Sequence, residues 1–176
     1  MSYLTKIVLG SNVFLNNDTF KPVDSLKIGD DLVSYIPSDL KISNEDIELI
    51  KDSTQSISHS LDEFPAKGQF ISNRIKSINI IKQSNTFIKI NENINNNNSE
   101  MSTLLDLETH IYTNRGWLPI VDSNKVEVSD CYLNWKNRWK VIYEITDVIN
   151  LIPSIDVYEI ETEYDNILLE SFIVKQ

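Results

Sequence analysis

Two stretches that lie far apart in this chain repeat one pattern of residues. Residues 19–35 (TFKPVDSLKIGDDLVSY) and 115–133 (RGWLPIVDSNKVEVSDCYL) each place an aromatic residue and a proline before an Asp-Ser pair. A lysine follows in each copy, Lys27 in the first and Lys125 in the second, and then an acidic residue and a further strand. Proline holds φ at about −65° and cannot donate to a strand ladder, so each copy ends a strand and turns the chain back. The repeat predicts a β domain built from two related halves.

Short segments rich in β-branched and aromatic residues fill most of the chain, separated by Asn, Asp, Ser and Gly. Such segments are typical of strands, and their frequency favours an all-β domain over βαβ units. The expected strands include YLTKIVLG (3–10), VEVSDCYL (126–133) and LLESFIVKQ (168–176). With 176 residues the chain can bury a core of its own, so we expect a single domain over residues 1–176.

Two segments are expected to leave the sheet. Residues 37–68 form an acidic, Ser-rich insertion, which is too short for a core of its own. Within it, Ser43 and Asp46 have the spacing of a capping box, so the sequence predicts a short helix near residues 44–52. A low-complexity tract rich in Asn predicts a solvated loop over residues 91–99.

Composition excludes several classes of protein. The net charge is −10, so the chain could not replace counterions along a nucleic acid, and an anionic membrane surface would repel it. No apolar run has the length of a membrane span and no signal peptide is visible. The lone Cys131, with His59 and His110, leaves no disulfide framework or multi-cysteine metal site, so we expect no metal and no cofactor. We expect a protein of the cytoplasm or of a virion, with other protein chains as partners.

Three ordered motifs resemble those of the Hint family, the fold shared by inteins and Hedgehog autoprocessing domains. Residues 11–35 resemble the family's N-terminal motif, which begins with a nucleophile. Residues 107–119 (LETHIYTNRGWLP) resemble the motif TxxHPxxTxxGW, and residues 156–176 resemble the closing motif VYDLxV…HNFxANGIxVHN. The resemblance implies a Hint-type pseudo-twofold β domain. In active members a Cys or Ser attacks the carbonyl before it, a His and a Thr polarise that bond, and in inteins a terminal Asn then cyclises.

The resemblance implies a vestigial site at seven positions, which are Ser11, Leu107, His110, Glu159, Asp165, Lys175 and Gln176. Ser11 follows Gly10 and stands at the nucleophile, and His110 stands at the catalytic histidine. A hydroxyl is a poorer nucleophile than a thiolate and needs an adjacent base. Leu107 replaces the threonine whose hydroxyl would bond the scissile peptide, which weakens electrostatic preorganisation.

The closing motif departs further from the family. Glu159 keeps a carboxylate where many inteins carry Asp, but Asp165 stands at a usual His and cannot be a cationic donor at pH 7. Lys175 replaces the penultimate His and Gln176 replaces the terminal Asn. Gln forms its imide more slowly than Asn, and no peptide bond follows it in this sequence. We therefore expect splicing to be lost.

The sequence thus predicts a degenerate Hint domain that serves as a structural or interaction module, as in a virus or phage particle. An alternative is a slow autoproteolytic domain that cleaves itself after Gly10 through an ester at Ser11. A plain β-sandwich unrelated to inteins is a third hypothesis. In purely structural terms, Ser11 would be a turn serine, His110 a sheet histidine bonded to a carbonyl, and Glu159 a surface residue.

Overall fold

The computed structural model describes residues 2–37, 45, 48, 68–93, 100–137 and 139–176. In chain order the elements are β1 (Tyr3–Val8), β2 (Asn12–Phe14), β3 (Phe20–Pro22), the 3-10 helix η1 (Val23–Ser25), β4 (Asp31–Ile36), β5 (Gln69–Ser84), β6 (Phe87–Asn93), β7 (Glu100–Leu105), β8 (His110–Thr113), β9 (Gly116–Pro119), β10 (Cys131–Leu133), β11 (Trp139–Val141), β12 (Glu144–Val148), β13 (Ile155–Thr162), β14 (Ile167–Leu168) and β15 (Ile173–Lys175). The predicted all-β fold is confirmed.

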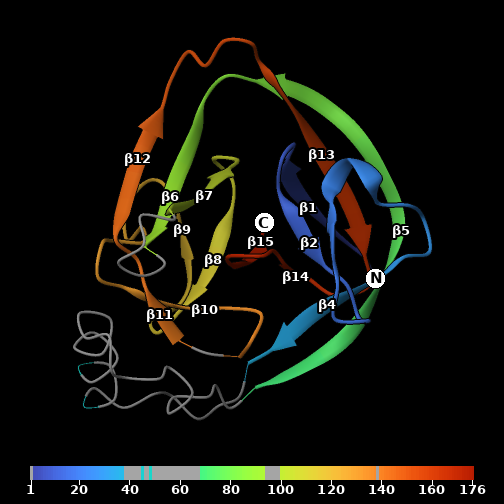
Figure 1. Cartoon of the computed structure of the whole chain (residues 1–176), viewed down its shortest axis with the longest axis horizontal. Coiled ribbons are helices and arrows are strands. Elements are labelled where there is room, and N and C mark those ends of the chain that lie inside the picture. Colours follow the sequence, from blue (N-terminus) through green and yellow to red (C-terminus); the bar gives the residue numbers. More distant parts are fainter. Residues whose placement is uncertain (1, 38–44, 46–47, 49–67, 94–99, 138) are drawn as a thin grey trace.

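The strands are arranged around β15, which lies near the centre of the molecule (Figure 1). One sheet has the order β1-β13-β5-β4, and another the order β11-β10-β8-β15-β14, with β9 paired to β8. A third has the order β12-β6-β7, and β2 pairs with β3. The long β5 curves around one side of the molecule, while β6 and β12 lie on the other (Figure 1). The first and last strands, β1 and β15, belong to different sheets but contact each other.

Matching backbone hydrogen bonds reveal the two related halves. In the first half, Val23 N donates to Ser11 O over 3.0 Å and closes the β2–β3 hairpin. In the second half, Ile120 N donates to Thr109 O over 3.3 Å and closes the β8–β9 hairpin. The prolines of the repeat end the second strand of each hairpin. The predicted pseudo-twofold arrangement is therefore confirmed.

The turns that follow the two hairpins are also closed alike. Asp30 Oδ2 accepts a hydrogen bond from Lys27 N over 2.9 Å, and Asp130 Oδ2 accepts one from Glu127 N over 2.7 Å. These bonds make Lys27 equivalent to Glu127, whereas the sequence pattern pairs Lys27 with Lys125. The difference arises because the second turn is longer than the first, so the two copies lose their alignment after the proline.

Two expected strands are shorter than the sequence predicts. Residues 126–133 are extended only over β10, because the hydrogen bonds of Asp130 hold the preceding residues in a turn. Residues 168–176 are divided between β14 and β15, because the chain turns where Leu169 N donates to Phe172 O over 2.8 Å.

The Asn-rich tract enters the sheet before it leaves it. The loop predicted over residues 91–99 begins later than expected, since residues 91–93 complete β6. Asn91 is buried, and its Nδ2 donates to Glu144 Oε1 of the neighbouring β12 over 3.1 Å. Residues 94–99 lie outside the described residues.

Most of the predicted insertion over residues 37–68 also lies outside the described residues, and so does most of the helix predicted near residues 44–52. Glu45 and Glu48 are described, and both are helical and exposed.

Strand β8 separates two groups of buried side chains. Ile111 on one face belongs to the main core, together with Ile7 of β1 and Val174 of β15. Tyr112 on the other face packs in an aromatic cluster with Trp117 of β9. Each fully buried aliphatic side chain contributes on the order of 2 kcal/mol to folding. The β8–β15 pair is therefore held firmly from both sides.

Candidate functional site

His110 begins β8 directly after a tight turn. Asp106 forms that turn: its backbone oxygen accepts from Thr109 N over 3.0 Å, and its Oδ2 accepts from Glu108 N over 3.2 Å. The Asp106 side chain is 2% exposed, and its Oδ1 lies 2.8 Å from Lys82 Nζ on β5. The ion pair ties the turn, and with it His110, to the neighbouring sheet.

A second ion pair joins the same turn to β1. Lys6 pairs with Glu108, and in the β1–β13 ladder Lys6 lies opposite Glu159. Residues opposite each other in an antiparallel pair place their side chains on one face, so Glu159 lies on the face that meets the turn. Leu107 is 37% exposed. It therefore offers an exposed apolar side chain where the family carries a threonine.

The structure brings together three of the residues proposed from the second and the closing motif. Lys175 of β15 lies directly opposite His110 of β8. Lys175 Nζ is 3.5 Å from Asp165 Oδ2 and 4.7 Å from the centroid of the Trp117 ring. An ion pair and a cation–π contact thus hold one ammonium group beside the histidine.

The surroundings of His110 favour its neutral form. Burial, and next the positive charge of Lys175, lower the pKa of His110 from its ordinary value. Both causes disfavour the imidazolium. His110 Nδ1 is buried and has no hydrogen-bond partner among the described residues. The ring is therefore not placed as a charged proton donor at neutral pH.

The depressed pKa predicts a pH-dependent stability. Between the folded pKa of His110 and its unfolded value of about 6.5, the unfolded chain binds more protons. This contribution to stability is complete above about pH 6.5 and is lost as the pH falls through the folded pKa. From about pH 5 to pH 7.5 we expect the free energy of unfolding to rise more for the wild type than for His110→Gln. The difference between the two rises should be less than about 1 kcal/mol, because the ring is partly exposed. Urea unfolding of both proteins at the two pH values measures this difference, and parallel curves would contradict it.

Gln176 continues from β15 on the opposite face of the β8–β15 pair. Its Nε2 is buried without a hydrogen-bond partner in the described part of the chain, and so are the side-chain oxygens of Thr109 and Thr5. Thr5 belongs to β1, which contacts β15. The amide nitrogen at the family's cyclising position is therefore shielded from solvent.

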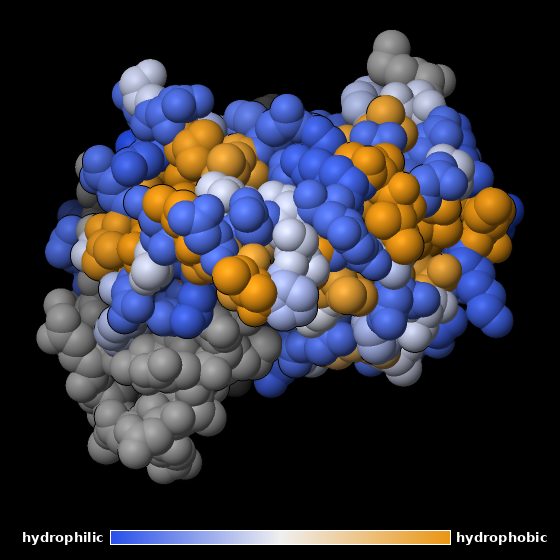
Figure 2. Space-filling model, turned by 90° about the horizontal axis from the view of Figure 1, so that it is seen from above, coloured by the Kyte–Doolittle hydropathy of each residue, from blue (hydrophilic) through white to orange (hydrophobic). Residues whose placement is uncertain are grey.

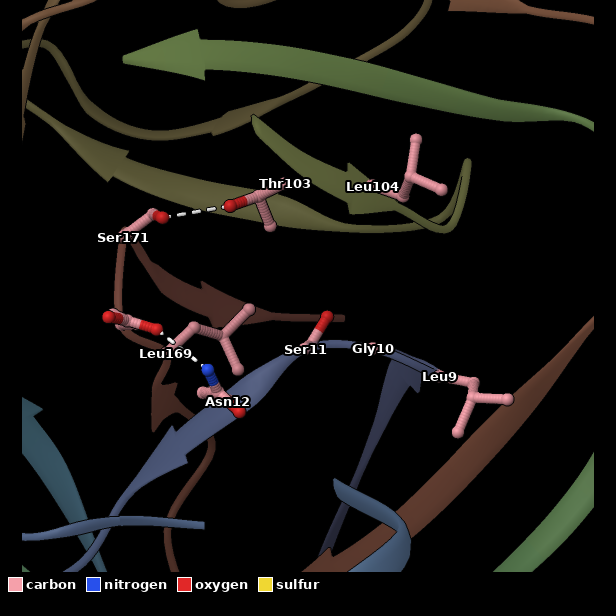
Figure 3. A pocket seen from close by; sticks show the side chains of 9 residues that line it. Leu9, Gly10, Ser11, Asn12, Thr103, Leu104, Leu169 and Ser171 are labelled. Atoms are coloured by element: carbon pink, nitrogen blue, oxygen red, sulfur yellow. Dashed lines mark hydrogen bonds between the residues drawn. The ribbon is translucent and has the colours of Figure 1, made fainter. Parts of the chain in front are cut away.

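Ser11 lies in the turn between β1 and β2. It borders a hollow of about 310 Å³ between residues 9–12, residues 103–104 of β7 and residues 169–171 (Figure 3). His110, Lys175 and Gln176 are absent from the described residues that line this hollow. No hydrogen bond within the described part of the chain joins Ser11 to His110. Ser11 is instead the pseudo-twofold equivalent of Thr109, and His110 is the equivalent of Asn12.

The hydrogen bonding of the Gly10–Ser11 peptide matters for chemistry. Ser11 N donates to Val8 O over 3.1 Å, just as Thr109 N donates to Asp106 O. The amide nitrogen that would leave in a cleavage reaction is thus engaged within its own turn.

Sequence reasoning missed several residues that shape the site. Asp106 could have been found, because an Asp whose side chain bonds the backbone two residues later is a known turn signal. The sequence indicates Trp117 as a strand anchor but not as the partner of Lys175. Nothing local predicts the Lys6–Glu108 pair, since its two residues lie far apart in the chain.

Among the described residues, no group of three His, Cys, Asp or Glu side chains could hold a metal ion. The described part of the chain also contains no helix long and apolar enough to cross a membrane.

Comparison with known proteins agrees with this geometry. No protein-family model matches the chain, and no curated protein sequence matches it. Among solved structures, it is similar to a bacterial intein-like domain from Clostridium thermocellum, with a TM-score of 0.61 and 11% identity over 98% of this chain and 99% of that one. It is also similar to a variant of the gp41-1 intein with three substitutions (TM-score 0.59, 12% identity, 98% and 99% covered). A DnaB intein from Synechocystis sp. PCC 6803 is likewise similar (TM-score 0.57, 10% identity, 97% and 98% covered).

At these identities the likeness establishes the fold. The chain has the Hint-type fold of inteins, as its three motifs predict. The alternative of an unrelated β-sandwich is wrong.

Proposed function

We propose that this chain is a Hint-fold domain that neither splices nor cleaves itself and serves as an interaction module for another protein chain. The observation that carries the proposal is the hydrogen bond from Ser11 N to Val8 O. A general acid must reach the departing nitrogen directly or through one water. Here no hydrogen bond among the described residues joins His110 to Ser11, and the turn holds the Ser11 N–H in place.

The hydroxyl of Ser11, at the nucleophile position, also lacks a hydrogen-bonded base among the described residues. A serine hydroxyl needs a base within hydrogen-bond reach. The charged residue among the described lining of the hollow is Glu170, and its Oε2 accepts from Asn12 Nδ2 over 2.8 Å. At the penultimate position, Lys175 carries an ammonium group, which donates hydrogen bonds but accepts none. Within the described part of the chain, neither group forms a hydrogen bond to Ser11.

The surface favours a binding role. In the described part of the chain β12 pairs with one neighbour, β6, so its other edge has no ladder partner and suits a partner strand. Exposed apolar side chains interrupt the polar surface on the face seen in Figure 2. Ile149 and Ile152, in the β12–β13 loop, are 65% and 90% exposed. A place in a virus or phage particle remains the prediction made from composition.

The test is the intact mass of the unmodified chain during long incubation at neutral pH, with and without hydroxylamine. We expect one species that keeps residues 1–10, because an ester at Ser11 does not accumulate. Hydroxylamine cleaves esters, so it would trap even a minor population. Release of residues 1–10 within hours would make the self-cleaving alternative the better account.

A further inference from the structure

The hollow beside Ser11 has the dimensions and the fixed walls of a binding site. Its volume of about 310 Å³ is at the lower end of ordinary small-ligand pockets. Its walls are tied together, because Val13 bridges to Leu169 and Glu170 N donates to Asn12 O over 3.0 Å. In Figure 3 the Ser11 hydroxyl faces the strand that carries Thr103. The site is therefore formed before any ligand arrives.

The polar groups of the hollow include several acceptors. Ser171 is 2% exposed, and its Oγ lies 2.8 Å from Thr103 Oγ1. Glu170 is the only charged residue among the described residues that line the hollow, and it has no ion pair in the described part of the chain. One carboxylate oxygen, Oε2, accepts from Asn12, and no hydrogen bond from a described residue reaches the other. A carboxylate oxygen and the nearby hydroxyls are thus left to receive donors.

The remaining walls are aliphatic. Leu9, Leu104 and Leu169 border the same hollow, but the Leu104 side chain points to the other face of β7, where it packs with Val8 and Phe87. A ligand that fits these walls has an apolar stem and a cationic end with several donors. A lysine side chain has this form, since four methylene groups carry an ammonium with three N–H donors.

We propose that this hollow binds a lysine side chain of a basic segment on a partner protein. The inference rests on the proposed function, because it names the group that the interaction module recognises. Glu170 accepts the ammonium, Ser11 supplies a second acceptor, and Leu169 packs against the methylene stem. The net charge of −10 attracts a basic partner before contact. The Ser11 hydroxyl, which has no hydrogen-bonded base among the described residues, thus serves as an acceptor for the ligand.

The probe is Nα-acetyl-lysine methylamide, added to the full chain while backbone amide signals are followed by NMR. Nα-acetyl-norleucine methylamide, which keeps the stem without the charge, is the matched control ligand. We expect the lysine probe to shift the amide signals of Ser11, Asn12 and Glu170, and norleucine to leave them in place. Glu170→Gln should weaken binding of the lysine probe about tenfold or more, because it removes the charge while keeping an amide oxygen for Asn12.

Glu163→Gln is the control variant, since it changes the net charge equally at an exposed residue outside the hollow. It should bind the lysine probe as the wild type does. Equal binding of norleucine, equal loss in both variants, or no shift of the Ser11 signal at saturating probe would overturn the proposal. The intact mass of the same samples reports separately on self-cleavage, so the proposed function and this binding site fail by different measurements.

Discussion

Replacing Phe172 with alanine is expected to lower the free energy of unfolding by about 3–5 kcal/mol. Phe172 is 1% exposed and belongs to the main core. Its ring centroid lies 4.6 Å from that of Tyr132 on β10, and its backbone oxygen closes the turn that separates β14 from β15. The substitution would leave a cavity beside the last strand, which the surrounding ladders allow to relax only in part.

The measurement is urea unfolding followed by tryptophan fluorescence. Phe70→Ala is the matched control, because Phe70 is 36% exposed and its ring meets Tyr35 at 5.5 Å. We expect the control to cost no more than about 1.5 kcal/mol, which is the upper end of the contribution of one aromatic pair. A loss at Phe172 no larger than that at Phe70 would show that β15 is not anchored through the core.

The two halves of the fold could be predicted from the sequence because the same backbone bonds require the same turn residues. Pro22 and Pro119 each end a hairpin strand, and Asp30 and Asp130 each accept a backbone hydrogen bond in the turn that follows. The alignment of the second turn with the first could not be predicted. The second turn is longer, and the sequence pattern matches Lys27 with Lys125 although the hydrogen bonds match it with Glu127. The break at residues 169–172 carries no Gly or Pro, so periodicity alone gives one continuous strand.

The site was predictable only where it follows from strand pairing. The closing motif puts Lys175 beside His110, because β15 is hydrogen-bonded to β8. The ion pairs that fix the His110 turn, Lys82 with Asp106 and Lys6 with Glu108, depend on tertiary structure and leave no local pattern. The hollow beside Ser11 likewise joins three segments that are distant in the sequence.

The fold and the chemistry of this chain are separable for a structural reason. The turn at Ser11 and the turn at Thr109 are equivalent, and both close through the same backbone hydrogen bond. This backbone bond does not depend on the side chains of Ser11 or Leu107. A change of side chains at Leu107 or Lys175 therefore leaves the framework in place, and the hollow between the Ser11 turn, β7 and residues 169–171 stays open to a ligand.

Asn73→Ala is expected to cost about 2–4 kcal/mol, because one side chain organises the whole segment that carries Asp165. Asn73 is fully buried on β5. Its Oδ1 accepts from Glu163 N and Tyr164 N over 3.0 and 3.1 Å. Its Nδ2 donates to Ser34 Oγ over 2.6 Å.

Removing this amide leaves buried polar groups without hydrogen-bond partners. Water can still reach the exposed residues Glu163 and Tyr164, and this access sets the upper limit of the loss in stability. Asn79→Ala, an exposed asparagine on the same strand, is the matched control and should change stability by no more than about 0.5 kcal/mol. Urea unfolding of both variants gives the two values.

Because Asp165 follows this segment and pairs with Lys175, Asn73→Ala should also loosen the ammonium beside His110. That change is measured as an upward shift of the His110 pKa by NMR, since the Lys175 charge lowers it in the wild type. An unchanged pKa and a loss no greater than that of Asn79→Ala would together refute this role for Asn73.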